Sequence, residues 1–115
     1  ITLGAVVLAA ADPATSFSHL PADLIAGYGA ALRRTERGLK AVLQFDKLNA
    51  LMLMMVDPHV HTHVIPRYAK PVVFGGVAWP DAAWPKPPVM SDALDVPDGV
   101  RAALRAALAE AIRAA

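Results

Sequence analysis

The segment from His59 to Ile65 restricts the possible structures of this chain more than any other, because histidine alternates there with valine or threonine. Successive residues of a β-strand point to opposite faces, so His59, His61 and His63 would all project from one face. They would stand about 7 Å apart, at roughly 3.3 Å of rise per residue. The pattern therefore predicts a strand with one face that carries imidazoles.

Three interpretations of this histidine row have to be compared. A histidine among apolar residues is usually a hydrogen-bonded core residue, but three on one face would need separate partners for their ring nitrogens. A zinc site needs three or four converging ligands, whereas the chain has no cysteine, His19 lies far upstream and Asp57 is the only nearby carboxylate. Imidazole, with a pKa of ~6.5, can attack, protonate or hydrogen-bond a phosphate near neutral pH. The pattern favours a phosphate site, and the other two interpretations stay open as alternatives.

Composition places these histidines in one small globular domain. The chain has 115 residues, of which 56% are hydrophobic and 18% charged, and its net charge is +1. This hydrophobic content is too high for a disordered chain, and no run of Lys or Arg indicates a nucleic-acid track. The absence of cysteine fits a reducing compartment, so we expect a cytoplasmic protein.

We expect the apolar N-terminal stretch to be neither a membrane span nor a signal peptide. It runs only to Asp12-Pro13, which is too short to cross a bilayer, and no basic residues precede it. The chain also starts without Met inside an expected strand, so we expect that the natural protein has a further N-terminal piece.

Hydrophobic periodicity and turn residues divide the chain into a single domain with three parts: a core at 1–70, a proline-rich tail at 71–95 and a C-terminal helix at 96–115. The expected elements are a buried strand at 2–10, a helix at about 21–43, strands at 47–56 and 59–65, an irregular segment at 69–95 and a helix capped by Asp95. Gly27, Gly29 and Gly38 each weaken the first helix by roughly 1 kcal/mol relative to Ala. Packing must therefore hold this helix, with glycine letting another backbone approach.

The segment His59-Val60-His61-Thr62-His63-Val64-Ile65-Pro66-Arg67 resembles the signature of the histidine triad (HIT) superfamily, in which three histidines alternate with apolar residues and Pro-Arg often follows. Thr62 stands where the signature usually has a larger apolar residue. The order of strand, long helix and the strand beginning Lys47-Leu48-Asn49 is similar to that of small bacterial members, over roughly residues 1–70. The resemblance implies an α+β fold, with a mainly antiparallel sheet, the long helix packed on it and a C-terminal helix.

The resemblance also implies an activity. His61 would attack the α-phosphorus of a nucleotide and form a nucleotidyl-histidine that water hydrolyses, without a cofactor or metal. His63 would hydrogen-bond a phosphate oxygen, and His59 would orient His61 or assist the leaving group. By residue type, Arg67 is equally a candidate for binding phosphate and for an ordinary charge at a strand end. Asn49 is a further candidate for substrate binding, although a plain strand residue is the favoured interpretation. The implied substrates are dinucleoside polyphosphates or nucleoside phosphoramidates, and the implied assembly is a homodimer. Trp79 and Trp84 could stack on a base or anchor the tail across a partner subunit, and the prolines of the tail favour anchoring.

One stretch departs from the family pattern. Members often have a Gly-rich polar segment before the histidines, whose backbone N–H groups help to hold phosphate. Here the segment reads Met54-Met55-Val56-Asp57-Pro58, which offers a proline without an N–H and a carboxylate. The departure leaves open two alternatives to a hydrolase or transferase: a HIT-like protein that binds nucleotides without turnover and, less favoured, a metal-dependent hydrolase.

Overall fold

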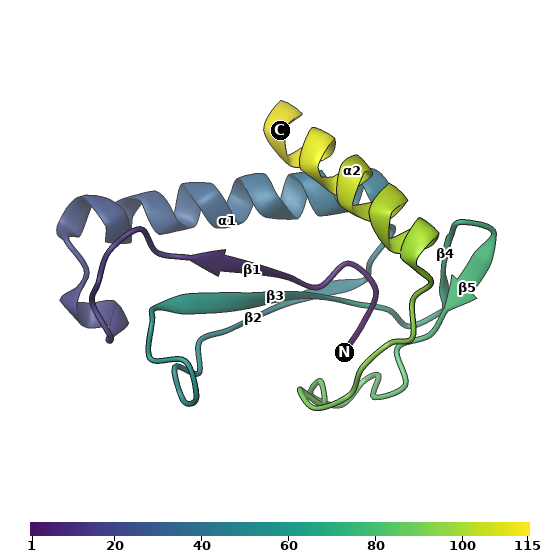
Figure 1. The fold of residues 1–115 in the computed structure, drawn as a ribbon, viewed down its shortest axis with the longest axis horizontal. Helices are drawn as coiled ribbons and strands as arrows, with labels where there is room; N and C mark the ends of the chain where they lie inside the picture. The colour runs from purple at the N-terminus through teal and green to yellow at the C-terminus, as the bar shows by residue number, and fades with distance from the viewer.

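The computed structural model describes all 115 residues. In chain order the elements are β1 (Val6–Ala9), a 3-10 turn (Phe17–His19), α1 (Ala22–Val42), β2 (Lys47–Leu51), β3 (His61–Arg67), β4 (Val72–Phe74), β5 (Val77–Trp79) and α2 (Asp98–Ala114). The strands β1, β3 and β2 form an antiparallel sheet in that order, and β4 pairs with β5 in a separate hairpin. Both helices lie on one side of the three-stranded sheet (Figure 1). The α+β architecture predicted from the sequence is confirmed.

The register of the sheet separates its two faces. Val6 lies opposite Val64, and Val7 lies opposite His63 on the neighbouring strand. Val64 is fully buried beneath the helices, whereas the side chain of Val7 is 55% exposed. One face of the sheet therefore packs against the core, while the face that carries His61 and His63 is open.

The core lies between the covered face of the sheet and the two helices. Its buried members are Leu3, Leu39, Leu43, Phe45, Val64, Tyr68, Val72, Trp79, Leu104 and Leu108. Leu104 and Leu108 come from α2, as their spacing of four residues predicts. Neither helix is long and apolar enough to cross a membrane.

The strand predicted at 47–56 ends at Leu51. Met54 has a φ of +44°, a left-handed conformation that an extended strand cannot include. The histidine strand is also displaced, because its regular pairing runs from His61 to Arg67 rather than from His59 to Ile65. A continuous apolar run predicts a strand but does not show where its pairing stops.

The segment at 69–95, predicted to be irregular, contains the hairpin of β4 and β5. Gly75 and Gly76 join its strands with φ values of +64° and +74°, the two left-handed residues that a tight hairpin turn requires. The Gly-Gly pair was the sequence signal for this hairpin. The C-terminal helix begins at Asp98, directly after Pro97, so the cap predicted at Asp95 is wrong.

Trp79 belongs to the core of its own chain. Its side chain is only 8% exposed, and its indole N–H donates a hydrogen bond to the carbonyl oxygen of Phe74 at 3.0 Å. The hairpin turns this tryptophan inward beside Val72, its partner on β4. Burial within its own chain leaves Trp79 unable to serve as the anchor across a partner subunit that the sequence suggested.

The crossing of α1 and α2 depends on Gly38. A Cβ atom at this position would lie 2.4 Å from Cγ1 of Ile112 and 2.8 Å from its backbone nitrogen. We expect Gly38→Ala to lower the free energy of unfolding by about 1–3 kcal/mol, because the helices must separate to admit the methyl group. Urea unfolding would measure the change.

Gly29→Ala is the matched control, because a Cβ at Gly29 would meet no atom within 4 Å. That variant should gain about 1 kcal/mol from the higher helix propensity of alanine. If Gly38→Ala were stabilised like Gly29→Ala, the close approach of the helices would be wrong.

Candidate active site

The histidine face is built by the central strand of the sheet. His61 begins β3 and His63 follows on the same face, opposite Ala9 and Val7 of β1. The centroids of the two imidazole rings are 5.0 Å apart, and the ring planes meet at 76°. Both side chains are half-buried, so they are held by neighbours and still reach solvent. Two of the three predicted catalytic residues thus form an edge-to-face pair on an open surface.

The hydrogen bond of His61 determines which of its nitrogens is available. Nδ1 lies 2.6 Å from the backbone carbonyl oxygen of His59. A carbonyl oxygen can only accept, so Nδ1 must carry the hydrogen. In the neutral ring the lone pair then resides on Nε2. The backbone thereby holds His61 in the tautomer that presents a nucleophilic nitrogen.

His59 itself lies just before the strand, and its ring is tied to the end of β1. Its Nε2 atom donates to the carbonyl oxygen of Ala10 at 2.5 Å. The carboxylate of Asp57 accepts a hydrogen bond from the backbone N–H of His59 at 3.0 Å. These contacts fix the carbonyl that orients His61, and they turn the carboxylate of Asp57 toward the backbone.

The ring of His63 remains free to contact a ligand. The hydrogen bonds of the histidine row are those of His59 and His61 to backbone carbonyls, and none involves the His63 ring. Beside it, the exposed side chain of Val7 adds apolar surface to the same face. The face therefore combines a free imidazole, an oriented imidazole and an apolar patch.

The loop between β2 and β3 borders the histidines with exposed apolar side chains. Met55 is 82% exposed and Val56 is 100% exposed. Met54 adopts the left-handed conformation that glycine takes without steric cost. The loop keeps a glycine-like backbone at this residue, although it lacks glycine.

Arg67 and Asn49 lie together, away from the histidines. Arg67 is four residues from His63, or about 13 Å along the strand at roughly 3.3 Å per residue. Its guanidinium donates to Asp81 at 2.7 and 3.2 Å, to Oδ1 of Asn49 at 2.8 Å and to the carbonyl oxygen of Lys86 at 2.7 Å. The three hydrogen bonds to Asp81 and Lys86 clamp the proline-rich segment onto the sheet, and the fourth links β3 to β2.

This clamp gives Arg67 a structural role in place of the phosphate contact expected from the sequence. The side chains of Arg67 and Asp81 are 5% and 2% exposed. Burial alone would raise the pKa of Asp81, but hydrogen bonds from Arg67 and from the backbone N–H of Tyr68 outweigh it, so the pKa is lowered. The pKa of Tyr68 is raised by burial and by the charge of Asp81.

Two parts of this arrangement were not visible in the sequence. The main-chain carbonyl of His59 has no residue-type signal, and Asp81 is fourteen residues from Arg67 with no motif joining them. His19, the fourth histidine, is exposed at the end of the 3-10 turn. Nowhere in the chain do three or more His, Asp or Glu side chains gather in an arrangement that could hold a metal ion.

The fold matches solved structures of histidine triad proteins. One from Bradyrhizobium japonicum superposes with a TM-score of 0.75 at 24% identity, covering 96% of this chain and 78% of that one. Another from Marinobacter aquaeolei VT8 gives 0.74 at 23% identity, covering 96% and 74%. A third from Sinorhizobium meliloti 1021 gives 0.74 at 22% identity, covering 92% and 73%. No protein-family model and no curated protein matches the chain significantly. These likenesses establish the fold.

Proposed function

We propose that this chain is a histidine triad protein that hydrolyses or transfers a nucleotidyl group, with His61 as the nucleophile. The observation that carries the proposal is the hydrogen bond from Nδ1 of His61 to the carbonyl oxygen of His59. It leaves Nε2 with the lone pair, which nucleophilic attack at phosphorus requires. The histidine triad fold of the chain supports the same conclusion.

The proposed reaction has two displacements. Nε2 of His61 forms a bond to the α-phosphorus as the bond to the leaving group breaks, and the leaving group departs with the electron pair and takes up a proton. Water then attacks the same phosphorus, the phosphorus–nitrogen bond breaks, and the nucleoside monophosphate is released. His63 lies beside His61 with a free ring, so its N–H can donate to a non-bridging oxygen as charge develops there.

The open face also suggests how the substrate lies. With the phosphate at His61 and His63, the nucleoside would contact the exposed side chain of Val7, which lies opposite His63. The proposed substrates are adenosine phosphoramidates and diadenosine polyphosphates. In both, the α-phosphorus carries a nucleoside on one side and a leaving group on the other.

The direct test is an assay of nucleotide release. We expect the purified chain to release AMP from an adenosine phosphoramidate or from a diadenosine polyphosphate, with activity unchanged by EDTA. Rapid quenching followed by mass spectrometry of peptides should find an adenylyl group on the peptide that contains His61. Absence of AMP release from the whole panel would exclude the hydrolase.

A second function is favoured by the loop between β2 and β3. Its Met54-to-Pro58 stretch has no glycine, and Pro58 provides no N–H to hold phosphate. A protein that binds nucleotides without turnover would show a rise in melting temperature with AMP but no release of product in the same assay. A protein with neither response would belong to neither class.

A further inference from the structure

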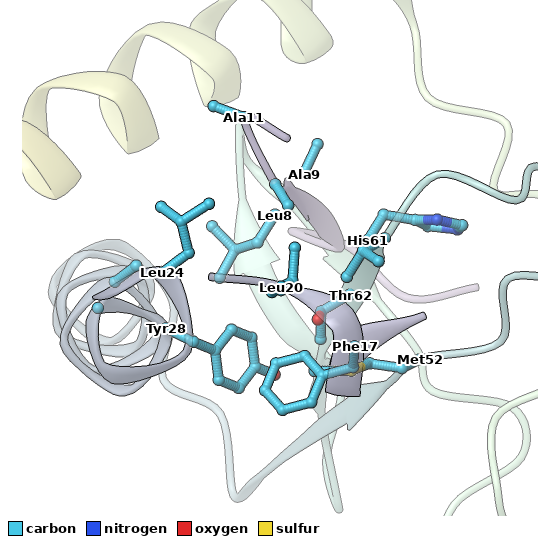
Figure 2. Close-up of a pocket in the computed structure, with 14 residues that line it drawn as sticks. Leu8, Ala9, Ala11, Phe17, Leu20, Leu24, Tyr28, Met52, His61 and Thr62 are labelled. Carbon is cyan, nitrogen blue, oxygen red and sulfur yellow. The ribbon is translucent and has the colours of Figure 1, made fainter. Parts of the chain in front are cut away.

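A cavity lies on the covered face of the sheet, beneath the first half of α1. Its volume is about 240 Å³, and 11 of its 14 lining residues are hydrophobic. The walls come from β1, the segment between β1 and α1, α1 and the beginning of β3, and they include Leu8, Phe17, Leu20, Leu24, Tyr28 and Thr62 (Figure 2). The proposed reaction leaves this cavity unused.

Thr62 gives the cavity a polar group. The residue is only 2% exposed, and its hydroxyl has no hydrogen-bond partner in the protein. Every fully enclosed polar side-chain atom in the structure does have a partner, so the Thr62 hydroxyl must reach the cavity. Figure 2 shows its oxygen on the cavity side of β3. An unpaired hydroxyl in an apolar recess favours a ligand that can hydrogen-bond to it.

The cavity is separate from the histidine face. Thr62 and His61 are successive residues of β3, so their side chains point to opposite faces of the sheet. His61 contributes to the rim of the cavity, but its imidazole points away from it (Figure 2). A ligand beneath α1 would therefore contact the back of the strand whose front carries the proposed nucleophile.

Size and lining indicate the class of ligand. A cavity of about 150 Å³ lined by apolar residues can hold benzene, so 240 Å³ has room for a bicyclic ring system. Phe17 and Tyr28 meet edge to face at 5.4 Å between centroids and form an aromatic wall. We propose that this cavity binds a small planar aromatic molecule with one hydrogen-bonding group on its edge, which pairs with the hydroxyl of Thr62.

Indole and benzothiophene test the proposal as matched probes, since a sulfur atom replaces the N–H donor in the second. We expect each probe, when it is titrated into the full chain, to change the amide chemical shifts of the residues that line the cavity. Indole should bind about tenfold more tightly, because only indole can donate to Thr62. Thr62→Val, which keeps the shape and removes the hydroxyl, should abolish this preference, and Thr62→Ser should retain it.

Filling the cavity provides the structural control. Ala31 lines it, whereas Ala30 on the same helix does not. Ala31→Leu should abolish indole binding, and Ala30→Leu should leave it unchanged. A saturating concentration of AMP should not displace indole, because the two sites lie on opposite faces.

Three results would overturn the proposal: no shifts at the cavity residues up to the solubility limit of the probes, an unchanged indole preference in Thr62→Val, or competition between AMP and indole. The last would make the cavity part of the nucleotide site. Because none of these measurements needs turnover, failure here is distinguishable from failure of the proposed reaction.

Discussion

Replacement of His61 by asparagine is expected to lower kcat for release of AMP by about 10³-fold or more, because the amide of asparagine has no nucleophilic nitrogen to replace Nε2. Asparagine keeps a polar group of similar width, so the strand and its register should be retained. The variant should also form no adenylyl adduct, which separates loss of the nucleophile from a general loss of binding. Single-turnover assays with excess enzyme would measure both quantities.

The neighbouring histidines provide graded controls. His59 acts on His61 through its main-chain carbonyl, which His59→Asn retains. His59→Asn should therefore lower kcat by only about tenfold, far less than His61→Asn does. His63→Asn should cost about 10²-fold to 10³-fold, the usual loss when one donor to a developing oxyanion is removed. If His63→Asn removed the adduct while His61→Asn retained it, the assignment of the nucleophile would be wrong.

Replacement of Arg67 by methionine is expected to lower the free energy of unfolding by about 3–5 kcal/mol. The change leaves the carboxylate of Asp81 buried without the guanidinium that holds it, and an uncompensated buried charge is costly. It also removes the hydrogen bond to Asn49, which links β3 to β2, and the bond to the carbonyl of Lys86, which joins the proline-rich segment to the sheet. Urea unfolding, followed by circular dichroism, would measure the loss.

The double variant Arg67→Met with Asp81→Leu tests whether the charge is the cause. It should recover much of the lost stability, since removing both members of a buried pair is much less costly than removing one. If Arg67→Met alone unfolded like the wild type but had a raised KM for nucleotide, the interpretation of Arg67 as a phosphate contact would be correct instead.

Alternation of residue types predicted the histidine strand and its two faces, although the strand begins at His61 and leaves His59 outside it. The side-chain period of a strand is two, and Val60, Thr62 and Val64 are all buried as that period requires. The helix that Pro21 precedes was predicted for a similar reason, because its apolar residues recur at helical spacing. Local patterns of this kind are properties of neighbouring residues and can be read directly from the chain.

The partner of Arg67, by contrast, could not be predicted from local patterns. Its position after the histidine motif suggested a ligand contact, but Asp81 approaches it only when the hairpin of β4 and β5 folds back onto the sheet. Nothing near either residue in the sequence specifies that meeting. Contacts between distant segments depend on how the whole chain packs.

The histidine row likewise has properties that the local sequence predicts and others that tertiary packing decides. The sequence by itself determined that three imidazoles alternate with small or apolar residues, and so which face of a strand they would share. Only the tertiary structure decided that the carbonyl of His59 orients His61, that the ring of His63 stays free and that the hydroxyl of Thr62 faces a cavity. The periodicity of a strand is local, whereas a tautomer and a cavity depend on atoms that other segments bring into place.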